Sequence, residues 1–179
     1  MKLSILIKAL NEEAKIAGAI ESSLAAIARL VTAGMLHPSE AEIIVADSLS
    51  SDQTVAIARS FPIRIVQLVH GTDRSCGAGA QLAFQHSRGE FVYLMDGDMR
   101  LHADFLPVAL QAMQPGIAGI GGRVNDIESG NLEFRARAAR AGNAFTSGNV
   151  DWLDCGGLYR RSAFEIGRAS CRERVCESV

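Results

Sequence analysis

Two aspartates, Asp96 and Asp98, stand one glycine apart directly behind the apolar run 91–95. Carboxylates at this spacing on an extended backbone project to the same side, and Gly97 allows the chain to turn between them. Such hard oxygen ligands suit Mg²⁺ or Mn²⁺, which completes its shell with water and substrate phosphates. The pair therefore predicts a metal site for a diphosphate, where a cation would neutralise the charge of a departing nucleoside diphosphate. Two like charges at the end of a hydrophobic strand also require a positive group nearby.

The elements that must position this pair alternate between strands and helices. Apolar runs predict strands at 3–7, 42–47, 63–69, 91–95 and 117–124. Helices are expected from an N-cap at Asn11 to about Val31, from Ser51 or Asp52 to about Arg59, up to about His86, over 103–113 and over 131–145. This alternation favours an α/β fold, a mostly parallel sheet flanked by helices.

Polar residues follow each of the first four predicted strands. In an open parallel sheet, ligands bind at the carboxyl ends of the strands, so these segments should meet in one crevice: 8–12, 47–52, 71–79 and 96–98. Each signal is weak alone. An Asp-x-Asp usually lies in a solvated loop, Asn11 and Glu12 equally suit the start of a helix, and Gly77 with Gly79 resembles a phosphate-binding loop only loosely.

Composition narrows the class of protein. The 179 residues are 48% hydrophobic with a net charge of −2, which fits a single globular domain without the basic surface that nucleic acid requires. No segment approaches the roughly 20 apolar residues of a membrane span, and the N-terminus lacks a signal-peptide pattern. The four cysteines show no zinc-site spacing. We expect a cytoplasmic protein.

The segment 166–179 breaks every earlier pattern, with two of the four cysteines and no helical or strand period. Its first ten residues, IGRASCRERV, resemble the translation of a common sequencing-library adapter. We expect native sequence to end near Glu165 and the rest to be a non-native tail, to be excluded from fold reasoning. The expected domain is then 1–165.

Four blocks of the sequence together resemble the family 2 glycosyltransferases: LIKALNEEAKIAGAIESSL, EIIVADSLSSDQTVAIA, GAGAQLAFQHSRGEFVYLMDGDM and CGGLYRRSAF. The resemblance covers the chain from its first strand to Glu165. It implies the GT-A fold and transfer of a sugar from a nucleotide donor to an acceptor hydroxyl, the acceptor being a sugar, a lipid-linked group or a small molecule. It also leaves room for membrane association of a longer protein.

The resemblance assigns roles residue by residue. Asp98 is expected to contact the Mg²⁺ or Mn²⁺ directly, with Asp96 on the metal and the donor. Asp47 should contact the base or ribose. The implied donor-binding residues are Ala9, Asn11, Glu12, Asp47, Gly77 and Asp96, and Gly156 and Gly157 are implied on the acceptor side.

This sequence departs from the family pattern at several positions. Leu10 replaces the usual aromatic before the asparagine, and Leu49 replaces a frequent glycine in the loop after the second strand. The arginine often found before the fourth strand falls at Ala80, so a positive contact to the donor is expected from Lys8 or Arg74. The family's general base follows the last matching block, so it is expected beyond Glu165, which would leave this chain an incomplete fragment.

Three other readings remain open. A haloacid-dehalogenase-type phosphatase also uses Asp-x-Asp at a strand end, but normally near the N-terminus and followed by Gly-Thr or Gly-Ser. A sugar nucleotidyltransferase would show a glycine-rich basic loop after the first strand, where this chain has KALNEE. A noncatalytic nucleotide-binding module is the third alternative.

Overall fold

The computed structural model describes residues 1–125, 148, 153 and 156–166. Within this part of the chain the sheet has six strands in the order β3-β2-β1-β4-β6-β5. The strands are β1 (Leu3–Ala9), β2 (Ala41–Asp47), β3 (Arg64–Gln67), β4 (Phe91–Asp96), β5 (Gly119–Gly121) and β6 (Gly157–Arg160). Strands β1 to β4 are parallel, whereas β6 runs antiparallel to β4 and β5. The expected α/β fold with a mostly parallel sheet is confirmed.

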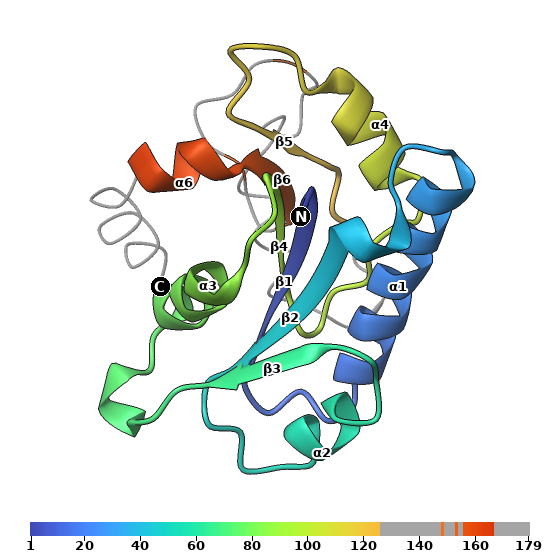
Figure 1. Cartoon of the computed structure of the whole chain (residues 1–179). Helices are drawn as coiled ribbons and strands as arrows, with labels where there is room; N and C mark the ends of the chain where they lie inside the picture. The colour runs from blue at the N-terminus through green and yellow to red at the C-terminus, as the bar shows by residue number, and fades with distance from the viewer. Residues whose placement is uncertain (126–147, 149–152, 154–155, 167–179) are drawn as a thin grey trace.

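Helices cover both faces of the sheet (Figure 1). The helices are α1 (Ile16–Thr32), α2 (Thr54–Ala58), α3 (Cys76–His86), α4 (Phe105–Ala112) and α6 (Arg161–Ile166), with short 3₁₀ turns η1 (Pro38–Glu40) and η2 (Gly71–Asp73). Helix α1 contacts α2 and α4 on one face, and α3 crosses β1, β2 and β3 on the other. No helix in the described ranges is long and apolar enough to cross a membrane.

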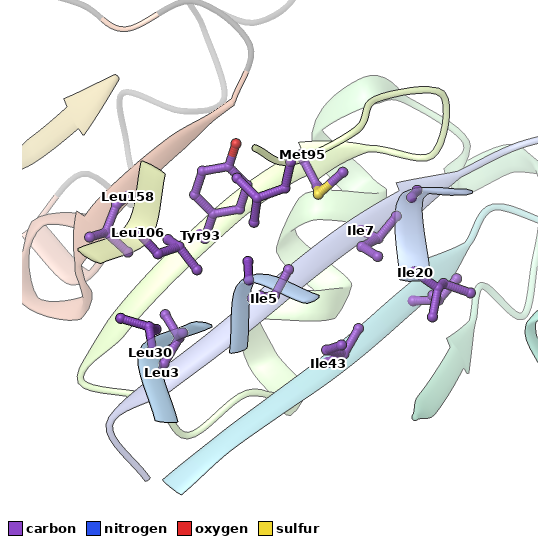
Figure 2. Packing of buried hydrophobic residues seen from close by; sticks show 14 of the residues in the cluster. Leu3, Ile5, Ile7, Ile20, Leu30, Ile43, Tyr93, Met95, Leu106 and Leu158 are labelled. Atoms are coloured by element: carbon purple, nitrogen blue, oxygen red, sulfur yellow. The ribbon is translucent and has the colours of Figure 1, made fainter. Parts of the chain in front are cut away.

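The strand side chains alternate between two hydrophobic cores. Ile5, Ile7 and Met95 belong to the larger core on the α1 side, part of which is drawn in Figure 2. Leu6 and Val92 belong to the smaller core beneath α3. Successive residues of a strand point to opposite faces of the sheet. A polar residue at the end of a strand therefore lies on the same face as the core residue two positions before it.

The expected start of the first helix is wrong. Helix α1 begins at Ile16, and Asn11 does not cap it but adopts a left-handed φ of 55°. The Asn11 amide donates to the hydroxyl of Ser50 in the loop after β2, and the Glu12 amide donates to the hydroxyl of Thr54, the first residue of α2. Asparagine tolerates this backbone region better than most residues, so the chain uses it to join two loops.

Two further expectations need correction or fall outside the described residues. Gly77 and Gly79 lie in the first turns of α3, not in a loop. The helix expected over 131–145 lies outside the described residues. Ile166 is the last residue of α6, and the rest of the expected tail, 167–179, is also outside the described part.

Strand β6 and helix α6 were not expected, and two arginines fasten them to the amino end of the sheet. Arg160 donates to the carbonyls of Ile117 and Met113, at 3.1 and 2.8 Å. Arg161 donates to the carbonyl of Gly89 and to the hydroxyl of Ser87, both at 2.6 Å, and its guanidinium lies 4.6 Å from the centre of the Phe84 ring.

Candidate functional site

The positive group required beside the aspartate pair is Lys8. Strands β1 and β4 are adjacent and in register, with Lys8 opposite Asp96. Both residues lie an even number of positions beyond core residues of the α3 face, Leu6 and Val92, so both side chains emerge on that face. The Lys8 ammonium lies 2.7 Å from Asp96 Oδ1.

The two aspartates do not lie on one extended segment. Strand β4 ends at Asp96, and the Met99 amide donates to the Asp96 carbonyl at 3.1 Å, which closes a turn. The Gly97 amide donates to the Lys8 carbonyl at 2.8 Å and ties this turn to β1. Asp98 is exposed at the tip. The premise of two carboxylates projecting to one side of a strand is therefore wrong, although the turn still presents both.

Glu12 is the third carboxylate at this turn. A Cβ placed on Gly97 would lie 3.1 Å from Glu12 Cγ, so the Glu12 side chain packs against the turn. Partial burial raises the pKa of Glu12, and the negative charge of Asp98 raises it further, more than that of Asp96 does. The turn is thus a region of negative potential that a cation would relieve.

The carboxylates alone do not form a complete metal site. In the described part of the chain, no group of three or more acidic, histidine or cysteine side chains is arranged to hold a metal ion. Mg²⁺ and Mn²⁺ sites commonly use one or two carboxylates and take their other oxygens from water and substrate phosphates. The exposed carboxylate of Asp98, with Asp96 beside it, fits that kind of shared site.

Asp47 lies at the end of β2, and its side chain is fully buried. Its carboxylate accepts hydrogen bonds from the amide and the hydroxyl of Ser50 and from Gln67 Nε2. Buried carboxylates require such partners because desolvation is otherwise costly. Asp47 therefore organises its own loop, and its contact with a base or ribose stays a prediction.

The loops after β1 and β2 form one unit, which we call the loop clasp (residues 10–15 and 48–54). The Ser48 amide of the clasp donates to the carbonyl of Ala9, the last residue of β1, at 2.9 Å. The clasp bonds are Asn11 N to Ser50 Oγ at 2.8 Å, Ser51 N to Asn11 Oδ1 at 2.9 Å, Glu12 N to Thr54 Oγ1 at 2.7 Å, Glu13 N to Asp52 Oδ2 at 3.1 Å and Gln53 N to Glu13 Oε2 at 3.0 Å. Three expected donor residues, Ala9, Asn11 and Glu12, are thus held at one edge of the sheet.

A third loop supports the clasp through Arg74. The Arg74 guanidinium donates to the backbone carbonyls of Ser48 and Leu49. Leu49 has a φ of 63°, in the left-handed region that favours glycine. The left-handed backbone at Leu49 therefore explains why a glycine would suit this position, where the family often has one. Arg74 is used within the protein here, and Lys8 is the cation beside the aspartates.

The two glycines of α3 differ in their surroundings. Gly77 has open space where a Cβ would be, so packing does not explain its small size. At Gly79 a Cβ would lie 3.3 Å from Lys8 Cβ and 3.2 Å from Ser48 Oγ. Gly79, which was not among the expected site residues, therefore lets α3 approach the strand end where Lys8 emerges.

The residues expected on the acceptor side lie next to the aspartate turn. Gly156 has a φ of 80°, and a Cβ there would come within 2.9 Å of Met99 Cε. Gly157 begins β6 and pairs with Leu94 in β4. The structure therefore brings Gly156 beside the turn that carries Asp98. An acceptor role for either glycine stays a prediction.

Sequence reasoning missed Ser50 and Gln67 as the partners of Asp47. Both are common polar residues with no distinctive spacing, and Gln67 comes from a neighbouring strand. A weak signal existed for Lys8, since a lysine that ends an apolar strand beside another strand ending in aspartate is a plausible cross-strand pair. Recognising it required knowing that β1 neighbours β4.

Solved structures with the same arrangement are GT-A glycosyltransferases, and this likeness defines the fold class. TarS 1-349 of S. aureus in complex with UDP-GlcNAc matches with a TM-score of 0.63 at 20% identity, covering 94% of this chain and 48% of that one. Glucosyl-3-phosphoglycerate synthase of Mycobacterium tuberculosis, with Mn²⁺ and UDP, matches at 0.59 and 23% identity, covering 90% and 57%. The mannosyltransferase PcManGT of Pyrobaculum calidifontis, with GDP-Man and Mn²⁺, matches at 0.68 and 16% identity, covering 92% and 46%.

The family follows from the sequence. The sequence model of glycosyl transferase family 2 matches residues 4–167, so the chain belongs to that family. It spans about half the length of these solved structures. Curated proteins give no match to this chain.

Proposed function

We propose that the protein takes part in transferring a sugar from a nucleoside diphosphate donor to an acceptor hydroxyl, with a divalent cation on the donor diphosphate. The observation that carries this proposal is the Asp96–Asp98 turn, which closes the carboxyl end of β4 beside β1. Strand β1 lies between β2 and β4, so the chain order reverses there, and open α/β sheets bind ligands at such a point. Membership of family 2 supports the same function.

Each residue at this edge has a role in the proposal. Asp98, exposed at the tip of the turn, would hold Mg²⁺ or Mn²⁺, and Asp96 would add a second oxygen. When bound, the cation supplies Lewis-acid stabilisation of the departing diphosphate. The loop clasp, with Ala9, Asn11 and Asp47, would shape the nucleotide side, and the amino end of α3 near Gly77 would border the phosphates.

The donor class is proposed from the neighbours. TarS was solved with UDP-GlcNAc and the mannosyltransferase with GDP-Man, so we propose a UDP or GDP sugar. The acceptor side would include Gly156 and Gly157, close to Met99. A carboxylate base that deprotonates the acceptor hydroxyl is part of the proposed chemistry, and its location beyond Glu165 stays a prediction.

The rival enzymes fit less well. A phosphatase of the haloacid-dehalogenase type would normally place its Asp-x-Asp near the N-terminus, whereas here the motif follows the fourth strand and continues with Met99 and Arg100. A nucleotidyltransferase would need a flexible glycine-rich loop after β1, whereas this loop is fixed by the clasp. A noncatalytic nucleotide-binding module would share the donor site and differ only in turnover.

Isothermal titration calorimetry with a panel of nucleotides, with and without Mn²⁺, tests the proposal. We expect UDP or GDP to bind and Mn²⁺ to strengthen that binding. Absence of Mn²⁺-stimulated binding for every nucleoside diphosphate would reject the proposal. Release of pyrophosphate from a nucleoside triphosphate would favour a nucleotidyltransferase, and release of phosphate from a generic phosphoester would favour a phosphatase.

A further inference from the structure

Lys8 is the cation that contacts Asp96, one of the two proposed metal ligands. Its Cβ lies close to Gly79 of α3, and its ammonium lies 2.7 Å from Asp96 Oδ1. The paired side chains are 27% and 33% exposed, so water reaches them without separating them. The register of β1 and β4 fixes this pairing in the backbone itself, because Lys8 and Asp96 are direct cross-strand partners.

Two lysines partly compensate the negative charge around the turn. Asp96, Asp98 and Glu12 provide three carboxylates; Lys8 pairs with Asp96, and Lys15 interacts electrostatically with Glu12. A divalent cation that arrives alone therefore meets less negative charge than the carboxylates alone would provide. The lysines therefore weaken its attraction to the site, since the Coulomb energy falls as the opposing charges are compensated. A nucleoside diphosphate would bring further anionic oxygens to the same turn.

We propose that Lys8 is an internal counterion that makes divalent-cation binding at the Asp96–Asp98 turn depend on a nucleoside diphosphate. This inference rests on the proposed function of the turn. In the absence of nucleotide, the Lys8 ammonium holds Asp96 and repels a second cation. With the diphosphate present, the ammonium can pair with a phosphate oxygen instead, which offsets its repulsion of the metal and frees Asp96. Lys8 is thus a positioning residue that couples two ligands and avoids occupation of the turn by metal alone.

A purely structural ion pair would not affect metal binding, and the residue just before β1 forms such a pair. Lys2, just before β1, pairs with Glu40 at 3.4 Å with more than half of its side chain exposed (55%). Such surface pairs contribute about 0–1 kcal/mol and influence no distant ligand. Lys2→Met is therefore a matched control for Lys8→Met, since both remove one lysine charge at opposite ends of β1.

The test measures Mn²⁺ binding to the whole chain by electron paramagnetic resonance of free Mn²⁺, with and without UDP. A unit charge roughly 6 Å from a divalent ion in a watery medium changes its affinity about tenfold. We expect Lys8→Met to bind Mn²⁺ alone about tenfold more tightly than the parent. The gain in Mn²⁺ affinity on adding UDP should shrink by the same factor. Lys8→Arg and Lys2→Met should behave like the parent.

The outcomes separate the inference from the proposed function. If the parent shows no UDP-stimulated Mn²⁺ binding, the proposed function of the turn is wrong. If the parent shows it and Lys8→Met has the parent's affinity for Mn²⁺ alone, Lys8 is only a structural partner and the inference is wrong. Circular dichroism checks the fold of each variant, and Lys8→Gln, which keeps a polar side chain, provides a second neutral variant.

Discussion

The two ends of strand β4 carry charged residues that serve opposite purposes. At the carboxyl end, Asp98 is exposed on a turn and Asp96 is held by one lysine. At the amino end, Arg160 and Arg161 are occupied by main-chain carbonyls of neighbouring loops and lie over Phe91 and Phe84. The charges at the amino end hold the protein together, whereas those at the carboxyl end remain available to a ligand.

This difference shows how to separate functional charges from structural ones. Both groups are short clusters of charged residues beside glycines, and the sequence motifs DGD and GGLYRR look equally suggestive. The distinguishing feature is whether the protein itself supplies the hydrogen-bond partners. Guanidinium groups that already donate to backbone carbonyls have little left to offer a substrate.

Asp47 breaks the simple rule that charges at the carboxyl end are available, and its removal should have the largest effect on stability. Asp47→Ala leaves the Ser50 amide and Gln67 without their acceptor and opens the buried site. We expect a loss of about 2–4 kcal/mol in the free energy of unfolding, measured by urea denaturation. Asp98→Ala, on the exposed turn, should change it by less than about 0.5 kcal/mol. Equal stabilities for the two variants would contradict the contrast.

Arg161→Met tests the amino end. The variant loses the bonds to the Gly89 carbonyl and the Ser87 hydroxyl and the contact with the Phe84 ring. We expect a loss of about 2 kcal/mol of unfolding free energy, because hydrogen bonds to charged groups are worth roughly 1.5–3 kcal/mol each and part is regained from water. Arg88→Met, at an exposed arginine of the same loop, is the control.

The affinity for nucleotide gives the second half of that test. Because Arg161 lies at the far end of the sheet, the folded Arg161→Met protein should bind UDP with Mn²⁺ as the parent does. A tenfold weaker affinity at full folding would mean that the amino end contributes to the site after all.

Leu49→Gly should stabilise the protein. A leucine at a φ of 63° pays a left-handed backbone penalty of roughly 1–2 kcal/mol, part of which is offset by the greater unfolded-chain entropy of glycine. We expect a net gain of about 0.5–1 kcal/mol in thermal or urea unfolding. Leu10→Gly in the other half of the clasp, where φ is not positive, should give a loss instead. A loss in both variants would show that the Leu49 side chain contributes more than its backbone costs.

Glu12→Gln should have the smallest effect, and the effect should depend on pH. Since burial and then Asp98 raise the pKa of Glu12 above its usual 4.5, the folded state favours the protonated form. The related stability is present below pH 4.5 and is lost as pH rises through the folded pKa. At pH 7 Glu12→Gln should therefore melt about 1–2 °C above the parent. At pH 4 the difference should nearly vanish, and an equal difference at both pH values would contradict this expectation.

Most of the sheet was predictable from sequence because its strands are apolar runs with polar ends. Because the carboxyl ends of parallel strands lie at one edge of a sheet, the sequence also correctly predicted that Asp47, Asp96 and the first loop lie in one region. The predicted helix start at Asn11 was wrong because this residue uses its amide and side chain for hydrogen bonds to the loop after β2, not to cap a helix. Strand β6 was missed because its four residues, GLYR, are too few to show a strand pattern.

The residue types of the site could be predicted from the sequence, but the contacts between these residues could not. That Asp47 is buried and Asp98 exposed follows from partners contributed by other strands and loops, which no spacing rule provides. The pairing of Lys8 with Asp96 depends on strand order, since only the adjacency of β1 and β4 brings them together. Sequence reasoning found that a positive charge was required and named Lys8 as one of two donor-contact candidates.

The most direct test of the account is the Mn²⁺ dependence of UDP binding in Asp98→Ala, measured by calorimetry beside the parent. Asp104→Ala is the control, because Asp104 is an exposed aspartate that pairs with Arg29 at 2.8 Å, away from the turn. The account predicts that Mn²⁺ strengthens UDP binding to the parent and to Asp104→Ala, and that this increase disappears in Asp98→Ala while the fold is unchanged. The same Mn²⁺-stimulated binding in Asp98→Ala as in the parent would contradict it.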